Sequence, residues 1–137
     1  METEVLLEKL CPPVRNWFKD NFPDFTHPQK VAIPKIMDGE HLLLCSPTGS
    51  GKTLTAFLSV INDLVIRSLD GSLGNSVQCV YISPIKALAN DIQKNLIGPL
   101  TEIKDTYLPS SAKDITVGLR TGDTPQKDRE KMLRKPP

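Results

Sequence analysis

The residues best suited to chemistry in this sequence lie at 46–53, which read Ser-Pro-Thr-Gly-Ser-Gly-Lys-Thr. Gly49 and Gly51 allow backbone amides to converge on phosphate oxygens, and a helix that starts here adds the positive end of its dipole. Lys52 can reach the β- and γ-phosphates of a nucleotide, and the hydroxyl of Thr53 can ligate Mg²⁺. The stretch therefore predicts a nucleoside triphosphate site, although serine stands first where the usual pattern has glycine.

The elements around this loop predict an α/β fold. An apolar run predicts a strand at about 41–45, directly before the loop. Two more strands are expected at about 77–83 and 115–119, with helices at 53–68, 85–97 and 125–134 and an irregular stretch at 98–109. This alternation is typical of an open, mostly parallel sheet with helices on both faces, which binds ligands at the carboxyl ends of its strands.

Short helices are expected before the sheet. The first two should lie around Val5 and Trp17, and a third should begin at Thr26 and stop at Gly39. Pro34 lies inside this third helix and predicts a kink or an early break.

Composition limits the classes of function. With 137 residues, 39% of them hydrophobic, one globular domain is expected. A net charge of +1, from 17 basic and 16 acidic residues, excludes nucleic-acid binding through bulk charge alone, so any such contact must be local. Three widely spaced cysteines suggest neither a disulfide framework nor a zinc site, and they fit a reducing cytoplasm. The sequence has no apolar run long enough for a membrane span, so no membrane partner is expected.

Three further motifs accompany the loop. Gln29 follows Pro28 on a helix that leads toward the loop, and its amide can offer a donor and an acceptor to adenine; otherwise it is a solvated helix residue. Pro84 and Lys86 follow the second strand, where a lysine and helix amides can grip a nucleic-acid backbone; otherwise they start an ordinary helix. The third motif, Thr121-Gly122-Asp123, follows the next strand in the same way and on its own is an ordinary turn.

In order and spacing, these stretches resemble the adenine-reading Q motif, motif I, motif Ia and the following nucleic-acid motif of superfamily 2 helicases. They are similar to the large helicase-related (Lhr) branch, where a Pro-Thr-Gly-Ser-Gly-Lys-Thr loop and a Ser-Pro-Ile-Lys-Ala-Leu motif also occur. The resemblance implies a RecA-like P-loop NTPase that uses ATP and Mg²⁺ to move on single-stranded DNA or RNA, together with a second RecA-like domain.

The resemblance also assigns residues. The ATP-binding set is Gln29, Pro47, Thr48, Gly49, Ser50, Gly51, Lys52 and Thr53, with Lys52 catalytic and Thr53 as the Mg²⁺ ligand. The nucleic-acid set is Pro84, Lys86, Thr121 and Gly122.

The sequence departs from this family in one respect. The Asp-Glu motif that holds Mg²⁺ and orients the attacking water does not occur here, nor does a second domain with its arginine finger. We therefore expect an N-terminal helical segment at 1–24 and an incomplete first RecA-like domain at 25–137, not competent for hydrolysis alone. A small P-loop kinase and a non-catalytic nucleotide- or nucleic-acid-binding module remain as alternatives.

Overall fold

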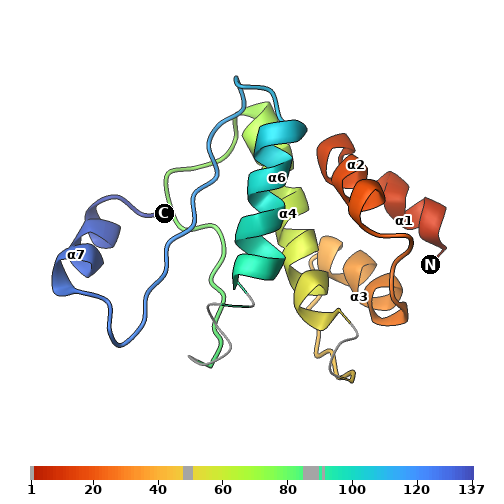
Figure 1. Cartoon of the computed structure of the whole chain (residues 1–137), viewed down its shortest axis with the longest axis horizontal. Coiled ribbons are helices and arrows are strands. Elements are labelled where there is room, and N and C mark those ends of the chain that lie inside the picture. The colour runs from red at the N-terminus through yellow and green to blue at the C-terminus, as the bar shows by residue number, and fades with distance from the viewer. Residues whose placement is uncertain (1, 48–50, 85–89, 91) are drawn as a thin grey trace.

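Helices dominate the computed structural model, which describes residues 2–47, 51–84, 90 and 92–137. Within these ranges the helical elements are α1 (Thr3–Lys9), α2 (Pro12–Asn21), α3 (His27–Met37), α4 (Lys52–Asp70), the π-helical η1 (Gln93–Ile97), α6 (Gly98–Thr106) and α7 (Gln126–Arg134). Figure 1 shows α4 and α6 in the middle of the molecule, with α1, α2 and α3 on one side and α7 on the other.

The core forms around α4, the longest of these helices. Its sequence places apolar residues three and four positions apart, so one face of the helix is apolar and becomes buried. The helices α2, α3 and η1 contact α4 directly, while α1 packs on α3 and α6 packs on α2. Side chains with almost no exposed surface come from α1 to α4 and from α6: Leu6, Leu10, Val14, Phe18, Ile33, Leu58, Ile61, Val65 and Ile103.

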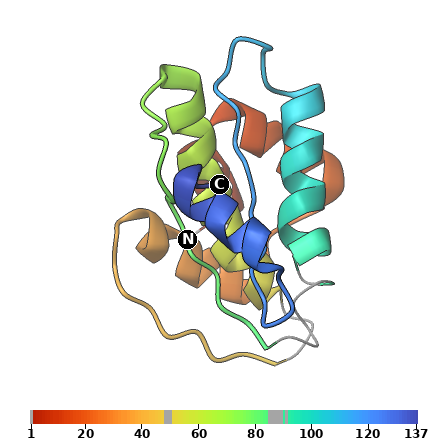
Figure 2. The ribbon, with the colours of Figure 1, turned by 90° about the vertical axis from the view of Figure 1, so that its left-hand side faces the viewer.

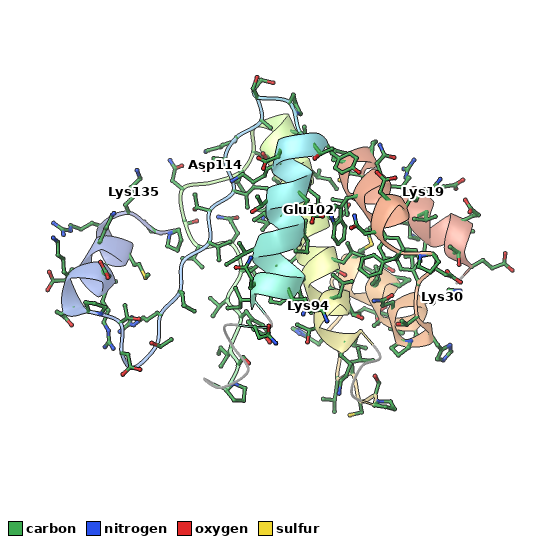
Figure 3. The ribbon with its side chains drawn as sticks, viewed as in Figure 1. Lys19, Lys30, Lys94, Glu102, Asp114 and Lys135 are labelled. Atoms are coloured by element: carbon green, nitrogen blue, oxygen red, sulfur yellow. The ribbon has the colours of Figure 1, made fainter. Side chains whose placement is uncertain are left out.

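Polar bonds tie the N-terminal helices to the rest of the fold. The indole of Trp17 donates a hydrogen bond to the carboxylate of Glu102 over 2.6 Å, and Figure 3 shows Glu102 on α6. The backbone N–H of Cys11 donates to Oδ1 of Asn62 on α4 over 2.8 Å. The helices α1 and α2 share one hydrophobic core with α4 and α6. The domain boundary expected between residues 24 and 25 stays a prediction.

Most helices predicted from the sequence are confirmed. The helix expected at 53–68 is α4, and the one expected at 125–134 is α7. Thr26 caps α3 as predicted, and Gly39 follows this helix with a left-handed φ of 78°. The early break expected at Pro34 is wrong, because α3 continues to Met37. Of the helix expected at 85–97, residues 85–89 and 91 lie outside the described residues, and the described remainder is helical.

The irregular stretch predicted at 98–109 is also wrong over most of its length, because α6 occupies Gly98–Thr106. Pro99 lies in the first turn of α6, where a missing N–H costs nothing. The N–H of Gly98 bonds to the carbonyl of Gln93, five residues earlier, which is the π-helical spacing of η1. Leu100 and Ile103 are buried, so tertiary packing favours the helix over the local Gly-Pro signal.

The predicted sheet is not formed by the residues that the structure describes. Segments 41–45, 77–83 and 115–119 carry no strand, and no backbone hydrogen bond between described residues joins two of them. A strand requires a hydrogen-bonded neighbour about 4.8 Å away. In a doubly wound sheet, strands that follow one another in the chain need not be neighbours, so three extended segments can occupy separate positions. The apolar runs therefore predicted strands that the described residues do not pair.

Side-chain exposure along the second of these segments fits this interpretation. The ring of Tyr81 packs against Phe57 of α4, with ring centroids 4.7 Å apart. The residues on either side of it are more exposed, since Val80 is 74% and Ile82 89% exposed against 36% for Tyr81. The segment thus has the two-sided alternation of a strand while only one of its faces is covered at this point.

The three segments predicted as strands lead toward one end of the molecule. In Figures 1 and 2, the orange segment before the loop, the green segment after α4 and the blue segment before α7 all run toward the lower end of the view, where α4 also begins, although the blue segment ends beside α7 and away from α4. We call this end the rim. Among the helices that the structure describes, none is long and apolar enough to cross a membrane.

Candidate functional site

The phosphate loop leads into α4 through a glycine that the backbone requires. Gly51 caps α4 with a left-handed φ of 81°, a conformation that side-chain-bearing residues rarely adopt. Its carbonyl accepts hydrogen bonds from the N–H of Thr55 over 3.0 Å and from the Thr55 hydroxyl over 2.7 Å. The first turn of α4 is thereby fixed directly behind the loop. Thr48, Gly49 and Ser50 lie outside the described residues, so their predicted roles stay predictions.

Two side chains with the predicted chemistry stand at the start of α4. The ammonium of Lys52 donates a hydrogen bond to the carbonyl of Ser46 over 2.6 Å, so it lies over the loop it is expected to serve. Thr53 is half-buried in the first turn of the same helix. A cation, a hydroxyl and the positive end of a helix dipole therefore meet at this point, which is the arrangement that a triphosphate with a bound cation would need.

Gln29 reaches the loop from α3 and is not the solvated residue of the alternative interpretation, since only 3% of it is exposed. Its Oε1 accepts a hydrogen bond from the N–H of Thr26 over 2.8 Å, and the Thr26 side chain accepts one from the Gln29 N–H, which forms a capping box. A Cβ added to Gly51 would lie 2.7 Å from Nε2 of Gln29. The side-chain amide of Gln29 therefore lies directly against the loop.

The chain entering α3 is held by Asp24. Its carboxylate accepts hydrogen bonds from the hydroxyl of Thr3 over 2.5 Å, from the N–H of Phe25 over 2.6 Å and from the ammonium of Lys30 over 3.0 Å. Figure 3 shows Lys30 on α3. The hydrogen bonds from Thr3 and Lys30 hold the pKa of Asp24 below its ordinary value. These contacts fix the direction in which α3 presents Gln29.

A cavity of about 440 Å³ lies beside the loop on the side of the extended segments. Lys52 and Thr53 contribute to its wall, but most of the wall is formed by apolar side chains, among them Leu42, Leu44 and Tyr81. Such a lining suits apolar side chains and not a charged triphosphate. We therefore place the candidate phosphate site at the loop and the start of α4, and not in this cavity.

The nucleic-acid residues predicted from the sequence are described only in part. Lys86 lies outside the described residues, and Pro84 is exposed. Thr121 and Gly122 begin a tight turn, residues 121–124, in which the N–H of Thr124 donates to the carbonyl of Thr121 over 3.2 Å. We call it the 121–124 turn. In Figure 1 the segment that carries this turn runs to the same lower end of the view as the start of α4, but it ends beside α7, across the width of the molecule from α4.

Comparison with known families decides the class of this protein. The model of the family described as DEAD/DEAH box helicase matches residues 26–137. The chain belongs to this family. The match includes the loop, Gln29 and the 121–124 turn, and the predicted resemblance to superfamily 2 helicases is therefore confirmed.

Relatives of this helicase chain carry the Lhr name, which confirms the resemblance to that branch. This chain is 45% identical over 134 residues to the ATP-dependent helicase Lhr-Core of Sulfolobus acidocaldarius, and the match covers 98% of this chain and 15% of the relative. It is 50% identical over 130 residues to the Lhr-Core helicase of Methanothermobacter thermautotrophicus, covering 93% of this chain and 15% of that protein. The chain thus spans about 15% of the length of these curated relatives.

A solved structure supports the fold. The Mycobacterium smegmatis helicase Lhr, described as bound to ssDNA and AMP-PNP, matches 96% of this helicase chain and 16% of its own chain, with a TM-score of 0.78 and 41% sequence identity. The helices and extended segments of this chain therefore follow the path of the corresponding part of an Lhr helicase, even though the described segments form no paired strands.

Two features of the site were not found from the sequence. The Thr26-x-x-Gln29 spacing is a capping-box signature and could have shown that Gln29 is held in place. The contacts of Arg129 on α7 with the 121–124 turn have no such signature, because they join a side chain to backbone carbonyls. The pattern in the sequence therefore predicts the turn but not what holds it.

Proposed function

We propose that this chain supplies the ATP-binding part of an Lhr-like, ATP-dependent helicase that moves on single-stranded DNA or RNA. The observation that carries the proposal is the contact between α3 and the loop, in which the Gln29 amide lies against Gly51, the residue directly before Lys52. A nucleotide-binding site with a base reader and a phosphate cradle needs those two groups at one place. Family membership supports a helicase over the small kinase that the loop alone allows.

In this proposal the triphosphate lies on the loop, with backbone amides of residues 48–51 and the ammonium of Lys52 around its oxygens. Proline has no N–H, so Pro47 shapes the loop and the residues after it supply the donors. Binding the nucleotide requires Lys52 to exchange its bond to the Ser46 carbonyl for bonds to phosphate. A charged phosphate oxygen is a stronger acceptor than a carbonyl, so this exchange is favourable.

The residues present also fit Mg²⁺. Mg²⁺ commonly keeps several waters and takes its other ligands from phosphates and a few protein oxygens, so the Thr53 hydroxyl is a sufficient first contact from the loop. Among the described side chains, no group of three or more histidine, cysteine or acidic residues could hold a metal ion. When bound, the ion would neutralise phosphate charge.

The rim would hold one strand of nucleic acid through Pro84, Lys86, Thr121 and Gly122. A net charge of +1 provides no general attraction, so the contacts must come from local donors at the rim. Preference for ATP and binding of a single strand are separate parts of the proposal, and each has its own test.

The first test concerns Gln29. Its Oε1 has a second lone pair beyond the bond to Thr26, and its Nε2 carries two hydrogens, which together match the N6 and N7 edge of adenine. Gln29→Ala should lower the preference for ATP over GTP by about 1–3 kcal/mol, or roughly 5- to 150-fold, because the adenine edge loses its partner. Competition titrations with the two nucleotides measure this preference.

The matched control for that test is Thr26→Ala. Both substitutions remove half of the capping box, and each should cost about 1 kcal/mol of folding stability. Only Gln29→Ala should change base preference. An unchanged ratio of ATP to GTP affinity in Gln29→Ala would remove the adenine role of this residue.

The second test concerns Gly122, whose φ is not in the left-handed region and around which a Cβ would meet no atom within 4 Å. The fold itself therefore tolerates alanine there. If a nucleic-acid backbone approaches this glycine, Gly122→Ala should weaken single-strand binding by about 1–3 kcal/mol, roughly 5- to 150-fold, through steric overlap. Fluorescence anisotropy with a labelled single strand measures the affinity.

Gly74→Ala is the control for Gly122→Ala, because Gly74 lies in another loop and an added Cβ there has only ordinary contacts, the nearest at 3.4 Å. The thermal unfolding of both variants should match that of the parent. Equal single-strand affinity for Gly122→Ala and the parent would argue against close approach at this position.

A further inference from the structure

Arg129 on α7 contacts the 121–124 turn through three backbone carbonyls. Its Nε donates to the carbonyl of Thr124 over 3.0 Å, and its second terminal nitrogen donates to the carbonyls of Thr121 and Gly122, each over 3.0 Å. One guanidinium therefore spans both ends of the turn. Its planar fork of donors fixes their relative positions in a way that one point charge does not.

The turn does not need this arginine merely to satisfy its polar groups. Gly122 and Asp123 are exposed, and Thr121 and Thr124 are only half-buried, so water could bond to their carbonyls at little cost. What the guanidinium adds is a fixed shape. It also draws three carbonyl oxygens toward a cation, which reduces the negative potential that these oxygens would present to a phosphate.

Both threonine hydroxyls of the turn accept a hydrogen bond from a backbone N–H, which suits them to donate to an anionic partner. The Oγ1 of Thr124 accepts a hydrogen bond from the N–H of Thr121 over 2.7 Å, and the Oγ1 of Thr121 accepts one from the N–H of Asp123 over 3.2 Å. A hydroxyl that accepts in this way keeps its own proton for donation. Phosphate oxygens accept hydrogen bonds and cannot donate them when ionised, so they match both hydroxyls.

We infer that Arg129 is a positioning residue, which holds the 121–124 turn in the shape that binds a phosphodiester group of a single strand. Arg129 acts through the turn and does not itself contact the strand. This inference rests on the proposed function, because it assigns a role within the nucleic-acid rim. It adds α7 to the elements that build that rim.

The test compares Arg129→Lys, Arg129→Ala and the parent in the full chain, with a fluorescein-labelled oligothymidylate or oligouridylate of roughly 15 nucleotides as the probe. Affinity is measured by anisotropy over a series of salt concentrations. A positioning role predicts that both substitutions weaken binding by about tenfold or more, because lysine keeps the charge but cannot span three carbonyls. The slope of log affinity against log salt should stay that of the parent, because no phosphate contact is lost.

Two results would overturn the inference. One is parent affinity in either Arg129 variant. The other is recovery by lysine together with a salt slope in Arg129→Ala that is smaller by about 0.7, the change expected when one direct contact to a single-strand phosphate is lost. Arg134→Ala, which removes the same charge from an exposed position of α7, should stay within about twofold of the parent.

Two further readouts separate positioning from general damage to the fold. ATP affinity and the thermal unfolding midpoint should be unchanged in the Arg129 variants, whereas amide hydrogen exchange should increase at residues 121–124. Unfolding of α7 as a whole would overturn the inference. If the parent itself binds neither probe, the proposed nucleic-acid function fails as well, whereas normal binding by the variants refutes the role of Arg129 alone.

Discussion

This chain on its own should bind ATP without hydrolysing it at a motor-like rate, even with single-stranded nucleic acid present. Lys52 and Thr53 supply charge and one metal ligand, but transfer to water also needs a carboxylate for Mg²⁺, a group that orients the water and a cation on the developing charge. The acidic residues Asp128 and Glu130 are exposed on α7, which Figure 1 shows far from the start of α4. An arginine finger alone contributes about 10³–10⁵ in rate.

Steady-state phosphate release from purified monomer, with Mg²⁺ and single-stranded DNA or RNA, measures this directly. Lys52→Ala serves as the background, because any release that it retains does not come from the loop. Turnover of about one per second that disappears in Lys52→Ala would contradict this prediction, because the chain would then contain a hydrolytic residue that we have not identified.

The second large effect concerns ATP binding, which should fall by about 10- to 150-fold in Lys52→Ala. This corresponds to about 1.5–3 kcal/mol, the usual contribution of a hydrogen bond to a charged group. Folding stability should stay within about 0.5 kcal/mol of the parent, because the Lys52 ammonium is exposed and bonded only to a loop carbonyl within the described contacts. Titration with a fluorescent ATP analogue gives the affinity.

Lys19→Ala is the matched control, since Lys19 is an exposed lysine on α2, where Figure 3 labels it. It loses the same charge and should keep parent affinity. Equal ATP affinity for Lys52→Ala and Lys19→Ala would mean that the loop does not bind the triphosphate.

Local signals in the sequence were sufficient to predict the helices near the loop. Thr26 and Gly39 marked the two ends of α3, and the glycine and lysine of the loop marked the start of α4. They also placed Gln29 on the correct helix. They could not show that its amide lies against Gly51, because that contact depends on how α3 packs on α4.

The predictions that failed depend on contacts between distant parts of the chain. Local rules treated Gly98 and Pro99 as helix breakers, yet burial of Leu100 and Ile103 stabilises α6 through them. Likewise, the apolar run at 77–83 predicted a strand, but a strand also requires a neighbouring backbone. Such pairing is set by the order of strands in space, which the sequence of one segment does not contain.

The loop and the 121–124 turn belong to different parts of the chain, since the loop leads into α4 and the turn leads into α7. Substitutions in one should therefore leave binding at the other unchanged when each ligand is titrated alone, because sites that share no partners contribute additively.

Amide chemical-shift mapping of the full chain by NMR tests the central claim most directly. Addition of AMP-PNP with Mg²⁺ should shift the amides of residues 46–53 and of Gln29 in a saturable manner, and addition of a single strand should shift those of residues 121–124. Saturable nucleotide binding whose shifts lie elsewhere, with the loop and Gln29 unchanged, would contradict the account.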